Sequence, residues 1–281
     1  MAESSSSSAS SSSLSAIQTS ASAAINRPVH CEHGRFAGRI IRAELTEIQR
    51  PEFGRRFGAV DRRALDDPPV VQLRFFEVFR PRPGYEWSEE VRSYESIPLS
   101  GLLCMAELFE ARGGPSTSEP LVPRQTGTLE LTSPRIAQPS RVYDVSDDAA
   151  ITEDSNRTSF LFGTKFVEPY LISTSDSGRK YLAFTFADLG VKLEGLFRLR
   201  YRFFDLFPGP PGVGKSSVLA ECYGGTFTMY STKEAPALKE STPLTKTLSN
   251  HGVPVNIRKK PRPPRRKTSP TGTSPTDSQP A

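Results

Sequence analysis

Apolar and polar side chains alternate with a period of two along much of the chain. In residues 39–46 and 70–78, apolar residues occupy alternate positions, with charged or polar residues between them. In residues 191–203 the odd positions are mostly apolar and the even positions mostly charged. A helix would scatter these side chains around its circumference, whereas a strand sorts them onto two faces. All three segments are therefore predicted to be strands, the last with arginines on a half-exposed outer face.

Further strands are predicted around this run. Residues 182–187 also alternate, and Asp188, Leu189 and Gly190 would make a hairpin connection to the strand that follows. Residues 226–230 and 253–258 are predicted to be additional short strands.

A single short helix is predicted near the end of the chain. Ser241 or Thr242 can cap it, Pro243 suits its first turn, and Gly252 can end it. Many strands, little helix and no alternation of strand with helix predict a mainly β fold. We expect an immunoglobulin-like antiparallel β-sandwich with one or two short helices and disordered termini.

Composition divides the chain into a domain and two tails. Hydrophobic residues make up only 36%, and the first stretch is nearly all Ser and Ala, so it has little to bury. We predict a disordered tail over residues 1–33, a sandwich domain over 34–262 and a second tail over 263–281. Within the domain, residues 112–160 are rich in Pro, Ser, Thr and Gly and are predicted to be a long insertion.

Cysteine content and hydropathy point to a protein inside the cell. The three cysteines are far apart and odd in number, which argues against a disulfide scaffold and for a reducing compartment. We find no apolar stretch of membrane-spanning length and no secretory signal, so no membrane partner is expected. The net charge of +5 permits an anionic partner without requiring one.

Residues 209–216 read GPPGVGKS and match the phosphate-loop pattern of nucleotide-binding proteins. Gly214, Lys215 and Ser216 would then form a nucleotide site. Such a loop must join a buried parallel strand to a long helix, whereas the preceding strand is amphipathic and two glycines soon interrupt the following segment. We therefore predict a surface loop and keep nucleotide binding as a weak alternative.

No other motif calls for catalysis. His30, Cys31 and His33 lie close together, but zinc usually needs four ligands and no matching pair lies nearby. No G-x-S-x-G elbow presents a serine for attack. We expect no enzymatic activity, no metal and no cofactor.

Two basic clusters are the candidate binding sites. The first, called here the Arg loop, interleaves arginines with glycine and phenylalanine and suits contact with a DNA backbone; its members are Arg50, Arg55, Arg56, Arg62 and Arg63. The second follows the last predicted strand and suits a nuclear-import signal or a phosphate-contacting arm; its members are Arg258, Lys259, Lys260, Arg262, Arg265, Arg266 and Lys267. For each cluster, a merely solvated basic surface is the alternative.

Three separate blocks resemble the velvet family of fungal developmental regulators: LDDPPVVQLRFFEV at 65–78, FADLGVKLEGLFRLRYRFFDL at 186–206, and KESTPLTKTLSNHGVPVNIRKK at 239–260. The resemblance implies a Rel-type sandwich that forms homodimers or heterodimers with other velvet proteins. It also implies a nuclear location, with or without shuttling to the cytoplasm, and control of sporulation and secondary metabolism.

The resemblance further implies that a basic string ahead of the block Asp61–Pro69 contacts double-stranded promoter DNA. Glu52 and Phe53 depart from this basic pattern. The leading hypothesis is a DNA-binding nuclear transcription regulator that dimerises and is carried by the import machinery. The alternative is an interaction subunit whose velvet partner contacts the DNA.

Overall fold

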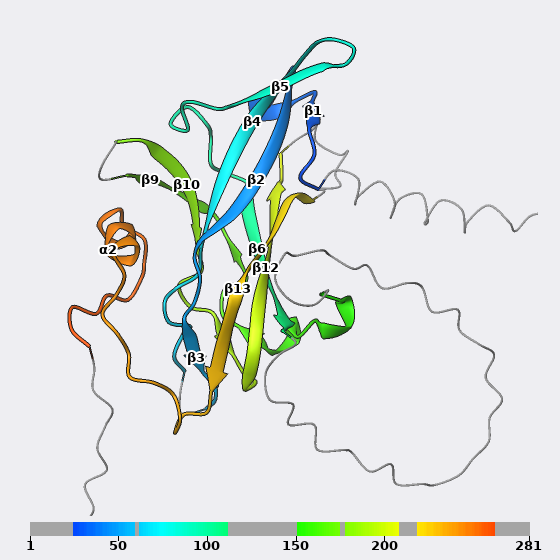
Figure 1. Ribbon diagram of the computed structural model, residues 1–281. Helices are drawn as coiled ribbons and strands as arrows, with labels where there is room; N and C mark the ends of the chain where they lie inside the picture. The colour runs from blue at the N-terminus through cyan, green and yellow to red at the C-terminus, as the bar shows by residue number, and fades with distance from the viewer. Residues whose placement is uncertain (1–24, 60–61, 112–150, 175–177, 208–217, 262–281) are drawn as a thin grey trace, which may run out of the picture.

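The computed structural model describes residues 25–59, 62–111, 151–174, 178–207 and 218–261. These residues form two facing β-sheets (Figure 1). The first sheet runs in the order β1 (Val29–Cys31), β2 (Arg39–Gln49), β4 (Val70–Arg82), β10 (Lys180–Thr185) and β9 (Pro169–Ser173), with β5 (Tyr85–Glu90) also pairing with β4. The second runs in the order β3 (Phe53–Arg55), β13 (Val218–Tyr230), β12 (Gly195–Asp205), β6 (Leu102–Glu110) and β8 (Phe166–Val167).

Smaller elements complete the described structure. They are the strand pair β7 (Leu161–Phe162) and β11 (Gly190–Val191), the helix α2 (Pro243–Asn250), and the 3-10 turns η1 (Gly34–Phe36), η2 (Glu153–Ser155) and η3 (Thr158–Phe160). Among the described strands every pairing is antiparallel except that of β3 with β13. The prediction of a mainly β protein is confirmed. No helix in these residue ranges is long and apolar enough to cross a membrane.

Alternate residues of both sheets meet in the core. Phe203 of β12 lies 5.8 Å from Phe75 of β4 and 6.1 Å from Phe184 of β10, measured between ring centroids. Phe186 and Tyr201 make a similar contact at 5.5 Å. All five side chains are at most 2% exposed, so the period-two pattern does mark the inner faces of these strands.

The outer face of β12 is not exposed as predicted. Arg200 is only 1% exposed: its guanidinium donates to Glu107 at 2.8 Å and to Glu153 at 2.6 Å and lies 4.5 Å from the ring centroid of Phe109. Arg198 is also buried, at 8% exposure. The prediction was wrong here because the carboxylates that pair with Arg200 come from distant parts of the chain.

The predicted hairpin around residues 188–190 is also wrong. The strand before it, β10, pairs with β4 and β9, whereas β12 pairs with β13 and β6. The connection therefore crosses from one sheet to the other, with the short strand β11 within it. A local turn signal does not reveal which sheet the next strand joins.

The predicted helix is confirmed as α2. Thr242 is the N-cap, since its Oγ1 accepts a hydrogen bond from the backbone N–H of Thr245 at 3.1 Å. Gly252 adopts a positive φ of 81° just beyond the last turn. Residues 253–258 form no strand, because Val253 donates its N–H back to Leu248 at 3.1 Å and so continues the helix end.

The ends of the predicted domain differ in detail. Residues 29–31, assigned above to the N-terminal tail, pair with β2, and the Asn26 side chain exchanges hydrogen bonds with the backbone of Glu221 at 3.0 and 2.9 Å. Of the predicted insertion, residues 112–150 lie outside the described ranges. Residues 153–158 run beside β6, where Arg157 donates its N–H to Leu108 at 2.7 Å.

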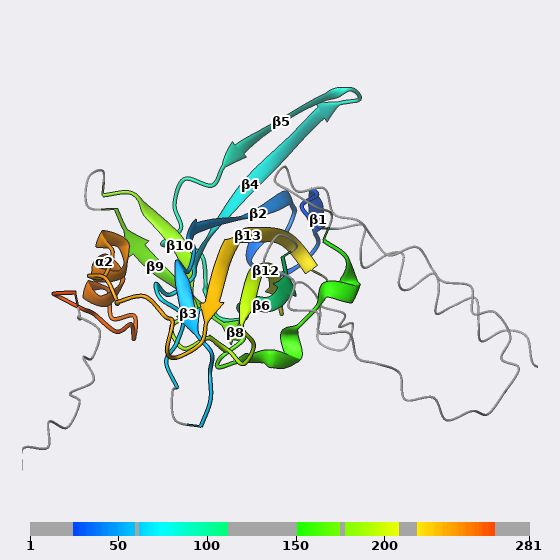
Figure 2. The ribbon, with the colours of Figure 1, turned by 60° about the horizontal axis from the view of Figure 1, so that its bottom comes forward.

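The β4–β5 hairpin projects from the sandwich as an arm, at the opposite end from β3 (Figures 1 and 2). Trp87 stacks on Phe79 with 5.2 Å between ring centroids and contacts Tyr85 edge-on at 5.6 Å. Tyr85 is 55% exposed and Trp87 40% exposed. The arm thus presents aromatic surface to solvent.

Candidate nucleic-acid interface

The first arginines of the Arg loop follow the edge of β13. Arg55 on β3 lies opposite Tyr230, the last residue of β13. Arg50 packs against Gly225, where a Cβ atom would stand only 2.6 Å from its Cδ. Because a strand rises about 3.4 Å per residue, these two arginines lie roughly 17 Å apart along β13. They form a row along the strand.

Most of the Arg loop faces solvent. Arg55 is half-buried and donates weakly to the Pro236 carbonyl at 3.5 Å. Arg56 pairs with Glu194 at 3.2 Å, but both side chains are more than 40% exposed, so the pair contributes little and can exchange for a phosphate. The exposed members are Arg50, Arg56, Arg62 and Arg63.

The two residues that depart from the expected basic pattern have structural roles. Phe53 is 4% exposed and packs edge-on against Tyr230 with 6.2 Å between ring centroids. Glu52 forms an exposed ion pair with Lys239, which raises the pKa of that lysine. The backbone N–H groups of Glu52 and Phe53 both donate to the carbonyl of Asp66, at 2.7 and 2.9 Å. These residues close the base of the loop, and Lys239 offsets the charge of Glu52.

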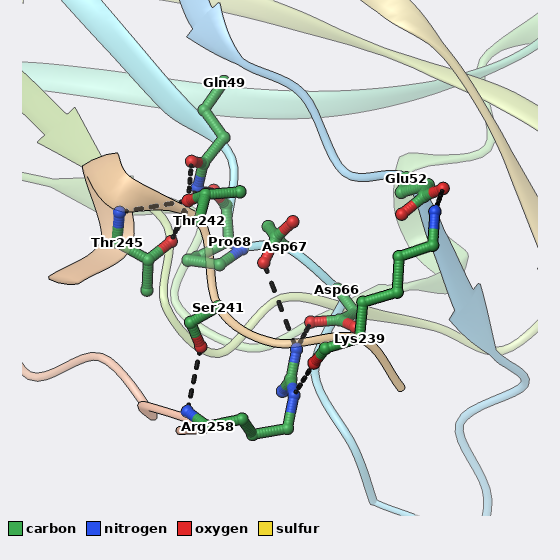
Figure 3. A network of polar contacts seen from close by, with 10 residues as sticks. All are labelled: Gln49, Glu52, Asp66, Asp67, Pro68, Lys239, Ser241, Thr242, Thr245 and Arg258. Carbon is green, nitrogen blue, oxygen red and sulfur yellow. Dashed lines mark hydrogen bonds and ion pairs between the residues drawn. The ribbon is translucent and has the colours of Figure 1, made fainter. Parts of the chain in front are cut away.

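Arg258 holds the other side of this base (Figure 3). Its guanidinium pairs with Asp66, lies 4.0 Å from Asp67 and donates from Nε to the carbonyl of Lys239 at 2.9 Å. Its backbone N–H donates to Ser241 Oγ at 2.9 Å, and the Ser241 N–H donates back to the Arg258 carbonyl at 3.1 Å. The segment after α2 is thereby fixed to the Arg loop.

Gln49 connects both ends of the loop to α2. Its side-chain amide donates to the Pro68 carbonyl at 2.8 Å and to Thr245 Oγ1 at 3.1 Å, while its Oε1 accepts from Thr242 Oγ1 at 2.6 Å (Figure 3). Gln49 precedes the loop and Pro68 follows it. The helix cap therefore also clamps the two strands from which the loop emerges.

Two acids near the loop titrate abnormally. Burial and the adjacent charge of Asp66 raise the pKa of Asp67, while the positive charge of Arg258 opposes that rise. Burial likewise raises the pKa of Glu47, although the Gly225 N–H and the Tyr201 hydroxyl donate to its carboxylate at 2.6 and 2.8 Å. Both carboxylates are thus penalised when ionised.

The second basic cluster is divided between two environments. Arg258 is largely engaged in the network, whereas Lys259 and Lys260 are exposed. The remaining members lie outside the described residues: Arg262, Arg265, Arg266 and Lys267.

The phosphate-loop residues Gly214, Lys215 and Ser216 also lie outside the described residues. Their flanks do not suit a phosphate loop, because β12 before them and β13 after them are antiparallel neighbours in one sheet. The segment from Val218 onward is strand rather than helix. The surroundings of the string therefore agree with an inter-strand connection.

Three residues beside the Arg loop form a cluster that the sequence did not predict. Phe57 stacks on Phe162 with 4.4 Å between ring centroids, and the Lys192 ammonium lies 5.4 Å from the centroid of the Phe162 ring. They come from distant segments and share no motif. Only the fold brings them together.

Comparison with known proteins decides the family. The profile of the velvet factor family matches residues 43–262. A probable velvet family sexual development regulator of Laccaria bicolor is 38% identical over 269 residues, covering 86% of this chain and 77% of the relative. A second, from Schizophyllum commune, is 42% identical over 234 residues, covering 83% and 78%. This chain belongs to the velvet family.

The velvet match spans both the Arg loop and the network around Arg258. More distant relatives include velvet complex subunit 2 of Gibberella moniliformis, 32% identical over 151 residues, which cover 49% of this chain and 34% of the relative. The relatives from Laccaria bicolor and Schizophyllum commune are both named as sexual development regulators.

Proposed function

We propose that this velvet protein binds double-stranded promoter DNA in the nucleus through the Arg loop. The supporting observation is the rigid base of the loop. Main-chain bonds from Glu52 and Phe53 and the Arg258 network fix its ends, while four of its arginines stay exposed. A fixed frame with exposed guanidinium groups suits phosphate contact, since the contacts set the position of the protein on the duplex.

The test is charge reversal at the two exposed positions Arg56 and Arg62. Arg55 is avoided because it is half-buried. Each phosphate contact contributes about 0.9 to the log–log salt slope, so losing two should flatten the slope by roughly 1.8 and weaken binding strongly at low salt. Fluorescence anisotropy with a labelled duplex measures both effects.

The matched control reverses Arg92 and Arg179, which are exposed outside the Arg loop. It changes the net charge equally, so it separates local contact from general attraction to DNA. If both double variants lose DNA affinity equally, or if neither loses any, the Arg loop is not the DNA contact.

We also propose that the protein pairs with another velvet protein and that the complex controls fungal development, including sporulation and secondary metabolism. The velvet complex subunits among the relatives support pairing. The arm supports it too, because exposed Trp and Tyr are typical of interface centres. Trp87→Ala should weaken co-purification with a velvet partner, and the unfolding midpoint of the protein alone checks that the variant is folded.

A second candidate function is an interaction subunit that leaves DNA contact to its partner. The ion pair Arg56–Glu194 favours it, because Glu194 offsets one of the positive charges that the loop offers. Binding of duplex DNA only after a velvet partner is added, with the salt slope unaffected by the Arg56 and Arg62 reversals, would support this version.

Nuclear import is proposed to use the basic cluster after α2. Because Arg258 is engaged with Asp66, we assign import to the cations that follow it. Neutralising Lys259 and Lys260 together with the later cations should leave a fluorescent fusion in the cytoplasm, whereas Arg258→Lys should not.

A further inference from the structure

A hollow of about 430 Å³ lies beside the Arg loop. Its lining consists of Phe57, Gly58, Ala59, Arg62, Phe162 and Lys192. The volume falls within the range of small-molecule sites, roughly 300–1,000 Å³. Arg62 belongs both to the Arg loop and to the hollow, so the two surfaces are continuous.

The aromatic wall is rigid although its parts are distant in sequence. The Phe57 N–H donates to the Val191 carbonyl at 2.7 Å, and β11 pairs Gly190 with Phe162. A Cβ atom at Gly190 would stand 2.8 Å from the Phe57 ring, so only glycine admits the ring at this depth. The backbone N–H of Lys192 donates to the carbonyl of Phe160 at 3.0 Å. The stacked rings are thus placed before any ligand arrives.

The chemistry of the lining selects a flat anionic ligand. Phe162 is 47% exposed, and the planes of the Phe162 and Phe57 rings make an angle of 25°. A further planar ring can therefore extend this stack or meet its edge. Lys192 and Arg62 carry positive charge and disfavour a cationic guest. An aromatic base that carries a phosphate satisfies both requirements, because bases stack on aromatic side chains while lysine and arginine take the backbone.

We infer that this hollow binds one unpaired base of a DNA strand whose neighbouring phosphates lie on the Arg loop. The inference rests on the proposed DNA binding and adds a preference that the loop alone would not give. A strand is favoured over a free nucleotide because Arg56 and Arg63 are exposed members of the same loop that do not line the hollow and suit further phosphates of the strand. The protein should therefore bind a duplex with one bulged base more tightly than a perfect duplex.

Base stacking on an aromatic side chain supports an affinity gain of about 5- to 150-fold. The experiment measures fluorescence anisotropy of the full chain with three labelled probes: a perfect duplex, the same duplex with one bulged thymidine, and the bulged duplex with an abasic residue in the bulge. The wild type should prefer the bulged thymidine, and the abasic probe should lose that preference.

Phe162→Ala should abolish the preference without changing affinity for the perfect duplex. Phe166→Ala is the matched control, since Phe166 is 53% exposed on β8 and does not line the hollow. Lys192→Gln is a second test that leaves the apolar wall intact, and it should reduce the preference partially. Unfolding midpoints check that each variant is folded.

Two failures are distinguishable. If the wild type binds the perfect duplex but shows no preference, or if Phe162→Ala keeps the preference, the hollow is not a base site and the proposed function survives. If the wild type binds no probe, the proposed function fails and the inference with it. Competition of free thymidine monophosphate against the bulged probe at equal concentration would assign the hollow to mononucleotides instead and overturn the inference.

Discussion

Replacing Arg258 by Met tests whether the second basic cluster begins with a structural residue. The side chain is 23% exposed and faces the carboxylates of Asp66 and Asp67, which are 11% and 15% exposed. Met keeps similar length and apolar volume but removes the charge and the Nε–H bond to Lys239. Two adjacent carboxylates then remain without their principal cation.

The expected cost follows from this geometry. Removing one partner of a fully buried ion pair costs about 3–5 kcal/mol, and one hydrogen bond adds about 1 kcal/mol. Partial exposure reduces the first figure, so we expect a loss of about 2–4 kcal/mol in the free energy of unfolding. For a domain of this size the melting temperature should fall by roughly 8 °C.

The loss should depend on pH. Arg258 opposes the rise in the pKa of Asp67, so the variant should raise that pKa further. An acid whose folded pKa is raised is favoured when protonated, so its penalty is present at neutral pH and disappears as pH falls through the acid range. The deficit of Arg258→Met should therefore shrink between pH 7 and pH 4.

Urea unfolding of the full chain measures this effect, and Lys260→Met is the control because Lys260 is exposed nearby. The same variants in the duplex-binding assay show whether a loosened loop base weakens DNA affinity. An Arg258→Met protein as stable as the Lys260→Met control at every pH would refute the assignment of Arg258 to the structural network.

Three further outcomes are expected. Arg200→Met should destabilise the protein by about 3 kcal/mol in urea unfolding, because the buried Glu107 then keeps only Arg202 as a cationic partner. Adding Glu107→Leu should recover part of the loss, and an additive loss would contradict this. Burial raises the pKa of Glu47 above its ordinary 4.5, so the contribution of this group to the free energy of unfolding should fall as pH rises through the raised pKa. Glu47→Gln should flatten this pH dependence. Calorimetric titration should detect no ATP binding to the wild type, whereas micromolar affinity abolished by Lys215→Ala would restore the phosphate-loop interpretation.

Local patterns predicted local structure well. The cap at Thr242 and the glycine at position 252 mark α2 because the signals and their hydrogen bonds lie within one short segment. The alternation in β12 likewise identifies its inner face, since Leu199, Tyr201 and Phe203 occupy odd positions and are at most 1% exposed.

Longer-range features could not be predicted in this way. Arg200 looked solvent-exposed because Glu107 and Glu153 lie far from it in sequence. Arg258 looked like one more cation in a basic run because its partner, Asp66, lies 192 residues earlier in the sequence. The Arg loop was recognisable from its composition, whereas the hollow beside it depends on a stacking of Phe57 with Phe162 that no spacing indicates.

The pairing beside β6 bears on how velvet chains can vary in length. Glu110, at the end of β6, and Arg157 form an ion pair at 2.8 Å, and Phe109 bridges to Asn156. The chain thus leaves and re-enters the sandwich at nearly one point. Because the entropy of closing a loop grows only slowly with its length, residues can be gained or lost between these positions at little energetic cost. The stretch between Glu110 and Arg157 is accordingly a suitable place to insert a fluorescent reporter. It is also a position at which a new regulatory segment can be added during evolution.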